Sequence, residues 1–116
     1  MLDKYIQGIY NINMRILSEP ITFEWDVGNE NKSWLKHQIS KEECEHIFNR
    51  EDSIVFKDIK HSSSELRYVI IGKNLEQRLL FIAFTIRQDK IRVISARPAS
   101  GRERKLYEKE IDTSQI

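Results

Sequence analysis

The segment RLLFIAFTIRQDKIRVISARP, residues 78–98, decides the fold. Its first part, 78–86, is almost entirely apolar, which is typical of a central strand that is covered on both faces. A second strand pattern, 90–97, follows after only two residues, Gln88-Asp89. A connection this short predicts an antiparallel hairpin. Pro98 lacks the backbone N–H that a sheet needs, so the second strand should end there.

The register of this hairpin follows from the length of its turn. With a two-residue turn, Thr85 pairs with Arg92 and Leu80 pairs with Arg97. Side chains alternate along a strand, so this register places Arg97 on the same face as Ile91 and opposite Arg92. Glutamine and aspartate are a poor pair for a type I′ turn, in which both residues have positive φ, so the sequence leaves the register open.

Helix and strand patterns lie on both sides of the hairpin. Ser40 with Glu43, and Ser100 with Glu103, have the spacing of a capping box, which predicts that a helix begins after each serine. The order β-α-α-β-β-β-β-α predicts one α+β domain in which helices pack on an antiparallel sheet. The expected elements besides the hairpin are strands at 21–25, 53–59 and 66–72 and helices at 29–37, 39–48 and 101–110.

The two ends of the chain stand apart in this prediction. Residues 1–20 carry apolar side chains without the period of a helix or a strand, so we expect an N-terminal extension before a domain at 21–110. Met14 lies shortly before that domain. The extension is therefore either the product of an upstream start codon or an extra element that packs on the sheet. Residues 111–116 are expected to form a C-terminal tail.

The composition is that of an ordinary globular protein, since 40% of the 116 residues are hydrophobic and 32% are charged. No apolar run approaches the ~18 residues of a membrane span. The single cysteine, Cys44, cannot form an internal disulfide. We therefore expect a cytoplasmic protein that does not contact a membrane. Trp25 and Trp34 are expected in the core, because large aromatic side chains dominate core burial.

The sequence offers no motif for a metal or a cofactor. Cys44 and His46 lie two residues apart on an expected helix and point in different directions, while His37 and His61 lie elsewhere in the chain. The glycines are scattered and form no phosphate-binding loop. We therefore expect neither a metal nor a cofactor. Cys44 is most simply a small buried hydrophobe, although a nucleophilic Cys–His pair stays open.

Positive charge gathers in the second half of the chain. Residues 1–64 hold 8 Lys and Arg against 11 Asp and Glu, whereas residues 65–110 hold 11 against 6. This asymmetry is expected if the second half meets a polyanion, although solubility alone also explains scattered basic residues. The arginines in and beside the hairpin are Arg87, Arg92, Arg97, Arg102 and Arg104.

These arginines have ordinary structural alternatives to ligand binding. An arginine on an apolar strand face needs a partner, so Arg97 either forms an ion pair with an acid such as Glu65 or Glu103 or contacts a ligand. Arg102 and Arg104 most simply form the solvated basic face of a helix. The sequence leaves the choice open for each of them.

Lysine, histidine and arginine can cleave RNA without a metal. In this reaction the ribose 2′-OH attacks the adjacent phosphate, so the site needs a base, positive charge on the phosphoryl oxygens and an acid for the departing 5′-oxygen. Arginine donates two hydrogen bonds to a phosphate at once, and histidine transfers protons near neutral pH. A basic module that binds nucleic acid or protein without catalysis carries the same residue types, so both classes of function stay open.

Four motifs occur in order along the chain: FEWD, W-L-K-H, E-x-R-Y-x-x-I-G and I-R-x-I-S-A-R. Together they resemble the BrnT family of toxins from type II toxin–antitoxin systems, over roughly residues 20–110. The resemblance implies a RelE-like fold and an endoribonuclease that inhibits translation. It also implies a cognate antitoxin of the ribbon-helix-helix type in a 2:2 complex, with operator DNA bound only through the antitoxin.

The resemblance also implies site residues. One position, Ser33, departs from the family pattern, because many members carry asparagine there. Lys36 or His37 would be the proton-transfer group, and Arg67 and Arg97 would hold the phosphate, so these four are the catalytic candidates. The candidates for binding RNA are Arg87, Arg92 and Arg102.

Overall fold

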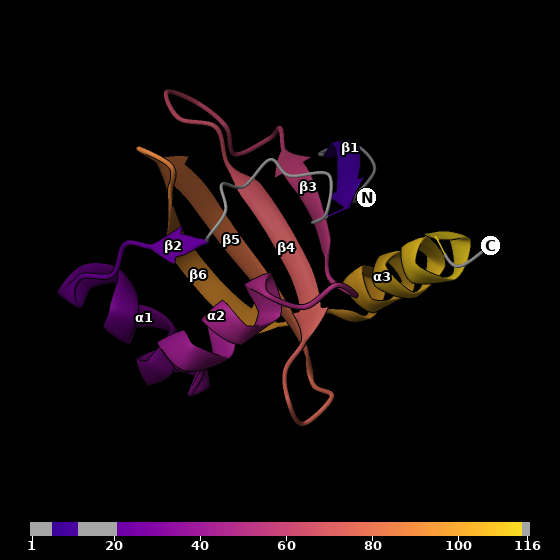
Figure 1. The fold of residues 1–116 in the computed structure, drawn as a ribbon, viewed down its shortest axis with the longest axis horizontal. Coiled ribbons are helices and arrows are strands. Elements are labelled where there is room, and N and C mark those ends of the chain that lie inside the picture. The colour runs from indigo at the N-terminus through magenta and orange to yellow at the C-terminus, as the bar shows by residue number, and fades with distance from the viewer. Residues whose placement is uncertain (1–5, 12–20, 115–116) are drawn as a thin grey trace.

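The computed structural model describes residues 6–11 and 21–114 of the chain. The elements follow the predicted order, with one strand added at the N-terminal end (Figure 1). They are β1 (Ile6–Asn11), β2 (Thr22–Phe23), α1 (Val27–His37), α2 (Lys41–Phe48), β3 (Ile54–Asp58), β4 (Tyr68–Lys73), β5 (Leu79–Arg87), β6 (Lys90–Pro98) and α3 (Gly101–Ser114). The predicted α+β fold with helices packed on a sheet is therefore confirmed. Of the helices in the described residues, none is both long and apolar enough to cross a membrane.

The described strands form one sheet in the order β1-β3-β4-β5-β6-β2. Neighbouring strands are antiparallel except for β2, which runs parallel to β6. The expectation of an antiparallel sheet is therefore confirmed except at this edge. It rested on hairpins between consecutive strands, whereas β2 reaches β6 from a distant part of the chain, so no hairpin sets its direction.

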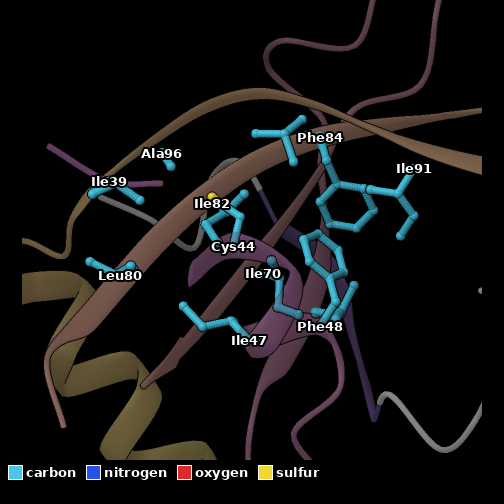
Figure 2. Packing of buried hydrophobic residues seen from close by; sticks show 12 residues of the cluster. Ile39, Cys44, Ile47, Phe48, Ile70, Leu80, Ile82, Phe84, Ile91 and Ala96 are labelled. Carbon is cyan, nitrogen blue, oxygen red and sulfur yellow. The ribbon is translucent and has the colours of Figure 1, made fainter. Parts of the chain in front are cut away.

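The sheet separates two apolar clusters. Ile70 of β4 packs with α2 in the first cluster, whereas its neighbours Val69 and Ile71 pack toward α3 in the second. In the first cluster the rings of Phe48 and Phe84 meet edge to face at 4.9 Å (Figure 2). Burying a side chain of this size contributes about 1.5–3 kcal/mol, so the two clusters hold helices on both faces of the sheet.

Reciprocal caps begin the helices. The predicted boxes are confirmed: Ser40 Oγ accepts from the Glu43 backbone N–H at 3.1 Å, and Ser100 Oγ accepts from the Glu103 N–H at 3.2 Å. Helix α1 begins two residues before its predicted start, because Asp26 caps it. Asn29 completes that cap with its own side chain, which accepts from the Asp26 N–H at 2.7 Å. The missed signal was asparagine in the place that glutamate or glutamine usually takes.

The hairpin turn is tight, but its register contains a bulge. Gln88 and Asp89 both have positive φ, at 51° and 65°, as a type I′ turn requires. Thr85 pairs with Arg92, as predicted. Further along, Phe84 pairs with Val93 but Ala83 pairs with Ser95, which leaves Ile94 as an extra residue in β6. The bulge shifts every later pair by one residue.

This shift corrects the predicted environment of Arg97. Arg97 pairs with Phe81 and not with Leu80, and its guanidinium lies 4.1 Å from the centre of the Phe81 ring. Phe81 packs in the cluster of α3, whereas Ile91 belongs to the cluster of α2. The bulge reverses the alternation of side chains, so Arg97 lies on the same face as Arg92 and on the face opposite Ile91.

Helix α1 covers the edge of β6 at this bulge. The Asn29 side chain donates to the Val93 carbonyl at 3.1 Å, and the Ala96 N–H donates to Ser33 Oγ at 2.8 Å. Asn29 and Ser33 are each only 6% exposed. These bonds satisfy edge groups that β2 does not reach, and they hold α1 beside the hairpin. The departure from the family pattern at Ser33 therefore keeps a polar group that a strand edge uses.

One strand comes from the segment that the sequence pattern separated from the domain. β1 pairs antiparallel with β3, for example through Tyr10 and Val55. Its residues lack a clean alternation of polar and apolar side chains, so the pattern did not predict it. Residues 12–20 lie outside the described part of the chain. At the other end, α3 continues past residue 110 to Ser114.

Candidate functional site

A hollow of about 280 Å³ lies where α1, the start of β4 and the β5–β6 hairpin meet. Four basic side chains line it, Lys32, Arg67, Arg87 and Arg92, together with one carboxylate, Glu65. We call it the basic hollow. Its volume is close to the lower end of the range for ligand pockets.

The basic hollow lies on the face of the sheet that α3 covers only in part. On β5, Leu79 and Phe81 pack in the cluster of α3. Thr85 and Arg87 follow on the same strand face by alternation, and both line the hollow. The hollow is thus the open end of a face whose other end carries a helix.

Backbone bonds fix the position of Arg67 just before β4. The Arg67 N–H donates to Ser62 Oγ at 2.9 Å, and its carbonyl accepts from the Asp58 N–H at 2.8 Å. The neighbouring Leu66 carbonyl accepts from Thr85 Oγ1 at 2.9 Å, and this threonine is buried. These bonds hold the segment against β3 and β5, so the Arg67 side chain starts from a fixed backbone.

Arg87 is held by a carboxylate inside the hollow. Its Nε donates to Glu65 Oε2 at 2.7 Å, and its Nη2 donates to Glu65 Oε1 at 3.1 Å. These hydrogen bonds lower the pKa of Glu65 and raise that of Arg87. The carboxylate is therefore ionised at neutral pH, and both of its oxygens point to one guanidinium.

Arg92 is held by two acids from the segment between β2 and α1. Its Nη1 lies 3.1 Å from Glu24 Oε1 and 2.9 Å from Asp26 Oδ2. The hydrogen bond from Arg92 lowers the pKa of Asp26, and the same bond raises the pKa of Arg92. Because Asp26 also caps α1, Arg92 joins the hairpin to the start of that helix.

Arg67 differs from these two arginines. Its guanidinium forms no ion pair with any side chain that the structure describes, and neither does the ammonium of Lys32. Arg67 is half-buried and Lys32 is exposed. The hollow therefore holds two cations whose hydrogen-bond donors are not taken by carboxylates.

Of the predicted site residues, the hollow unites Arg67, Arg87 and Arg92. Lys36 and His37 lie in the last turn of α1 and do not line it. Lys36 is four residues after Lys32, so it lies on the same helix face about 6 Å further along the axis.

Arg97 and Arg102 lie away from the hollow, at the end of the face that α3 covers. Arg97 donates to both carboxylate oxygens of Glu103, at 2.8 and 2.7 Å. This is one of the ion pairs considered as the alternative to ligand contact. Arg102 is exposed in the first turn of α3. Along β6, Arg97 lies roughly 13 Å from Arg92, since their partners on β5, Phe81 and Thr85, are four positions apart.

The Arg97–Glu103 pair is partly buried. The side chain of Glu103 is 7% exposed and that of Arg97 is 40% exposed. Burial raises the pKa of Glu103, but hydrogen bonds from Arg97 and Ser100 outweigh burial and leave that pKa below its ordinary value of 4.5. The pair thus joins β6 to the first turn of α3.

The sequence pattern missed two charged residues of the hollow, Lys32 and Glu65, as site residues. A signal for each existed. Lys32 precedes Lys36 by one helical turn, so the two share a face. Glu65 is the first residue of the E-x-R-Y motif, two positions before Arg67.

Two expectations for other reactive or aromatic residues are settled by burial. Burial raises the pKa of Cys44 to about 12, so its thiolate is not available near neutral pH and the Cys–His alternative loses its nucleophile.

Trp34 is 52% exposed, so its expected place in the core is wrong. The preceding residue, Ser33, faces β6 instead. Trp25 does pack against the core, and its Nε1 donates to Glu45 at 2.7 Å.

Within residues 6–11 and 21–114, no cluster of three or more His, Cys, Asp or Glu side chains is placed to hold a metal ion. The hollow instead offers guanidinium and ammonium groups beside a carboxylate. Such a set can bind a phosphodiester and move a proton.

Comparison with known proteins finds one family. The sequence model described as "Ribonuclease toxin, BrnT, of type II toxin-antitoxin system" matches residues 25–103. This match covers the charged residues that line the basic hollow. A search of the curated proteins gives no match.

Proposed function

Because the chain belongs to the BrnT family of ribonuclease toxins from type II toxin–antitoxin systems, we propose that it cleaves RNA in the basic hollow. Membership in this family also means that the protein has an antitoxin partner. The finer statements below concern the mechanism, the site and the form of that partnership.

The observation that carries this proposal is the guanidinium of Arg67, which forms no ion pair with a described side chain, in a hollow with three further cations. A guanidinium donates two parallel hydrogen bonds to a phosphate, and here those donors are not used by a carboxylate. Arg87 and Arg92 are already held by acids, so they position the RNA backbone and strengthen the local positive field.

The chemistry that suits this set needs no metal. The 2′-OH of a ribose attacks the adjacent phosphate, and Arg67 stabilises the charge that develops on the phosphoryl oxygens. Lys36 and His37 remain candidates for proton transfer, from the turn of α1 that follows Lys32. The ion pair with Glu103 favours a structural role for Arg97 over its predicted contact with phosphate. Arg102 remains a candidate for contact with RNA outside the hollow.

The partner proposal follows from the charge of the hollow. A ribbon-helix-helix antitoxin that offers carboxylates to Arg67 and Lys32 would occupy the place of RNA phosphates and inhibit the toxin. We propose a 2:2 complex that reaches operator DNA only through the antitoxin. Free toxin would inhibit translation by cutting RNA. An antitoxin contact confined to the α2 face of the sheet would contradict this arrangement.

The test compares Arg67→Ala with Arg78→Ala. Arg78 is exposed in the β4–β5 connection and lies outside the hollow, so it controls for the loss of one positive charge. We expect wild type and Arg78→Ala to arrest growth and to cut RNA in the presence of EDTA. Arg67→Ala should cut at least about 100-fold more slowly, as after the loss of one donor to a developing charge.

Other results would select the alternative functions. RNA binding without cleavage by the folded wild type would make the protein a non-catalytic nucleic-acid-binding module. If the folded protein neither bound nor cut RNA, it would be a protein-interaction module. Cleavage that EDTA abolishes would contradict the metal-independent mechanism while leaving the site in place.

A further inference from the structure

Glu65 is the one carboxylate among the residues that line the basic hollow. We infer that Glu65 is the general base that takes the proton from the attacking 2′-OH. The inference rests on the proposed function, since it adds a catalytic residue to the same reaction. It replaces neither Arg67 as the phosphate ligand nor the cations around it.

The position of Glu65 meets the first requirement for a base, which is a fixed place beside the reacting group. Arg87 holds the carboxylate through two hydrogen bonds, at 2.7 and 3.1 Å. Arg67, the proposed phosphate ligand, follows two residues later and lines the same hollow. A phosphate bound to Arg67 would therefore bring its ribose toward the Glu65 carboxylate.

The electrostatic setting meets the second requirement, a carboxylate that is ionised when substrate arrives. The hydrogen bond from Arg87 is the main cause that lowers the pKa of Glu65, and the charges of Arg87 and Arg67 lower it further. Each carboxylate oxygen has about two acceptor sites, so an oxygen bonded to Arg87 keeps a lone pair for a hydroxyl.

The other acids and bases near the hollow are placed less well. Glu24 and Asp26 hold Arg92 but do not line the hollow. Lys36 and His37 do not line the hollow either. Among the described residues, Glu65 is thus the acceptor that the fold already holds against the proposed phosphate site.

The atoms and electrons of the step balance as follows. The 2′-oxygen forms a bond to phosphorus while its proton passes to the Glu65 carboxylate. The bond from phosphorus to the 5′-oxygen breaks, and that oxygen keeps the electron pair and takes a proton from water. The products are a 2′,3′-cyclic phosphate and a free 5′-hydroxyl. Glu65 then returns its proton to solvent.

The test measures cleavage of bulk cellular RNA by Glu65→Gln, Glu65→Asp and the control Glu76→Gln. Glu76 is exposed in the β4–β5 connection and does not line the hollow, so its variant controls for the loss of one carboxylate. We expect Glu65→Gln to lower kcat by about 100-fold to 10,000-fold. Its KM should not rise, because the hollow loses a negative charge. Glu76→Gln should keep nearly the wild-type kcat.

A pH profile separates a base from a residue that only positions Arg87. In wild type, kcat/KM should fall on the acid side below pH 4.5, the ordinary pKa of a glutamate, because the pKa of Glu65 is lowered. Glu65→Asp keeps a carboxylate and should keep this fall with part of the rate. Glu65→Gln should lose it. Binding of 2′-O-methyl RNA, which cannot be cut, should be as tight to Glu65→Gln as to wild type or tighter.

Three results would overturn the inference in distinguishable ways. A folded wild type that does not cut RNA would remove the proposed function, and the inference would fall with it. Active wild type with an unchanged rate and pH profile in Glu65→Gln would remove only the inference. Loss of 2′-O-methyl RNA binding in proportion to the loss of rate would show that Glu65 only positions Arg87. If Glu65→Gln failed to fold, an aspartate variant without the acid-side fall would still decide against a base.

Discussion

Arginines that look alike in the sequence differ in the structure by what they donate to. Arg87 pairs with Glu65, and Arg92 pairs with Glu24 and Asp26. Arg67 forms no ion pair with a described acid. A guanidinium that is paired with a carboxylate offers a phosphate fewer free donors and a partly neutralised charge, whereas an unpaired one offers all five of its N–H groups. At the scale of the residue, availability therefore depends on the partner and not on the residue type.

Arg97→Ala should destabilise the fold more than it alters the hollow. The substitution leaves the carboxylate of Glu103, 7% exposed, without its main partner. We expect a loss of about 2 kcal/mol in the free energy of unfolding, because a buried charge without a partner is costly and Arg97 itself is partly solvated. Urea unfolding near pH 7 measures this loss. Arg102→Ala, an exposed neighbour, should change stability by less than about 0.5 kcal/mol.

The Arg97–Glu103 pair should also make the free energy of unfolding depend on pH. The folded pKa of Glu103 lies below the unfolded value of about 4.5, so its contribution to stability is full above that pH and is lost as pH falls through the folded pKa. Wild type should therefore lose stability below pH 4.5 more steeply than Arg97→Ala. Parallel curves for the two proteins would show that the pair does not stabilise the fold.

At the scale of the element, one inserted residue in β6 decides which helix the end of the hairpin meets. Before Ile94 the pairing of β6 with β5 follows the predicted register. After Ile94, each side chain of β6 lies on the face of the sheet opposite to the predicted one. The sequence pattern IRVISAR contains no glycine or proline to mark a bulge. The bulge coincides with the bonds from Asn29 and Ser33 of α1 to the edge of β6, so packing by a distant helix accompanies the local irregularity.

Gly72, the last residue of the E-x-R-Y-x-x-I-G motif, should not tolerate alanine. A Cβ there would overlap the Ser53 hydroxyl and lie 2.7 Å from Ile47 Cγ2. Ser53 is buried and donates to the Ile47 carbonyl at 2.8 Å, so it cannot easily move away. Overpacking of this kind should cost about 2 kcal/mol, measured by chemical unfolding. Gly101→Ala is the control, since nothing lies within 4 Å of its added Cβ; an equal loss in both variants would contradict the packing argument.

At the scale of the whole molecule, the acids of the first half partly neutralise the arginines of the second. Glu24 and Asp26 reach Arg92, while Glu65 and Glu103 are matched to arginines within the second half itself. The excess of positive charge counted along residues 65–110 therefore overstates how much of it faces a ligand. Within the basic hollow, Arg67 and Lys32 are the cations that form no ion pair with a described carboxylate.

Binding of uncleavable 2′-O-methyl RNA should depend on salt concentration, and the steepness of that dependence reports how many cations of the hollow meet phosphates. If three of the four cations of the hollow each meet a phosphate, the logarithm of the affinity should fall with the logarithm of salt concentration with a slope of about −2. Arg67→Ala should make the slope shallower by about 0.7, and Arg78→Ala should leave it unchanged. Fluorescence titrations between 50 and 300 mM salt, at about five concentrations, measure the slope. A slope near zero would contradict binding through phosphates.

The sequence by itself determined the order of the elements from β2 to α3, the capped starts of α2 and α3 and the short antiparallel hairpin of β5 and β6. Each depends on residues a few positions apart, whose periodicity or side-chain bonds are local. Only the tertiary structure decided the parallel edge strand, the bulge and the partners of the arginines. Glu24 and Arg92 stand 68 residues apart, and no local pattern specifies that they meet. The order of strands in the sheet brings them together, because β2 lies beside β6, and the hollow that Arg67 and Glu65 line forms where α1 meets the β5–β6 hairpin.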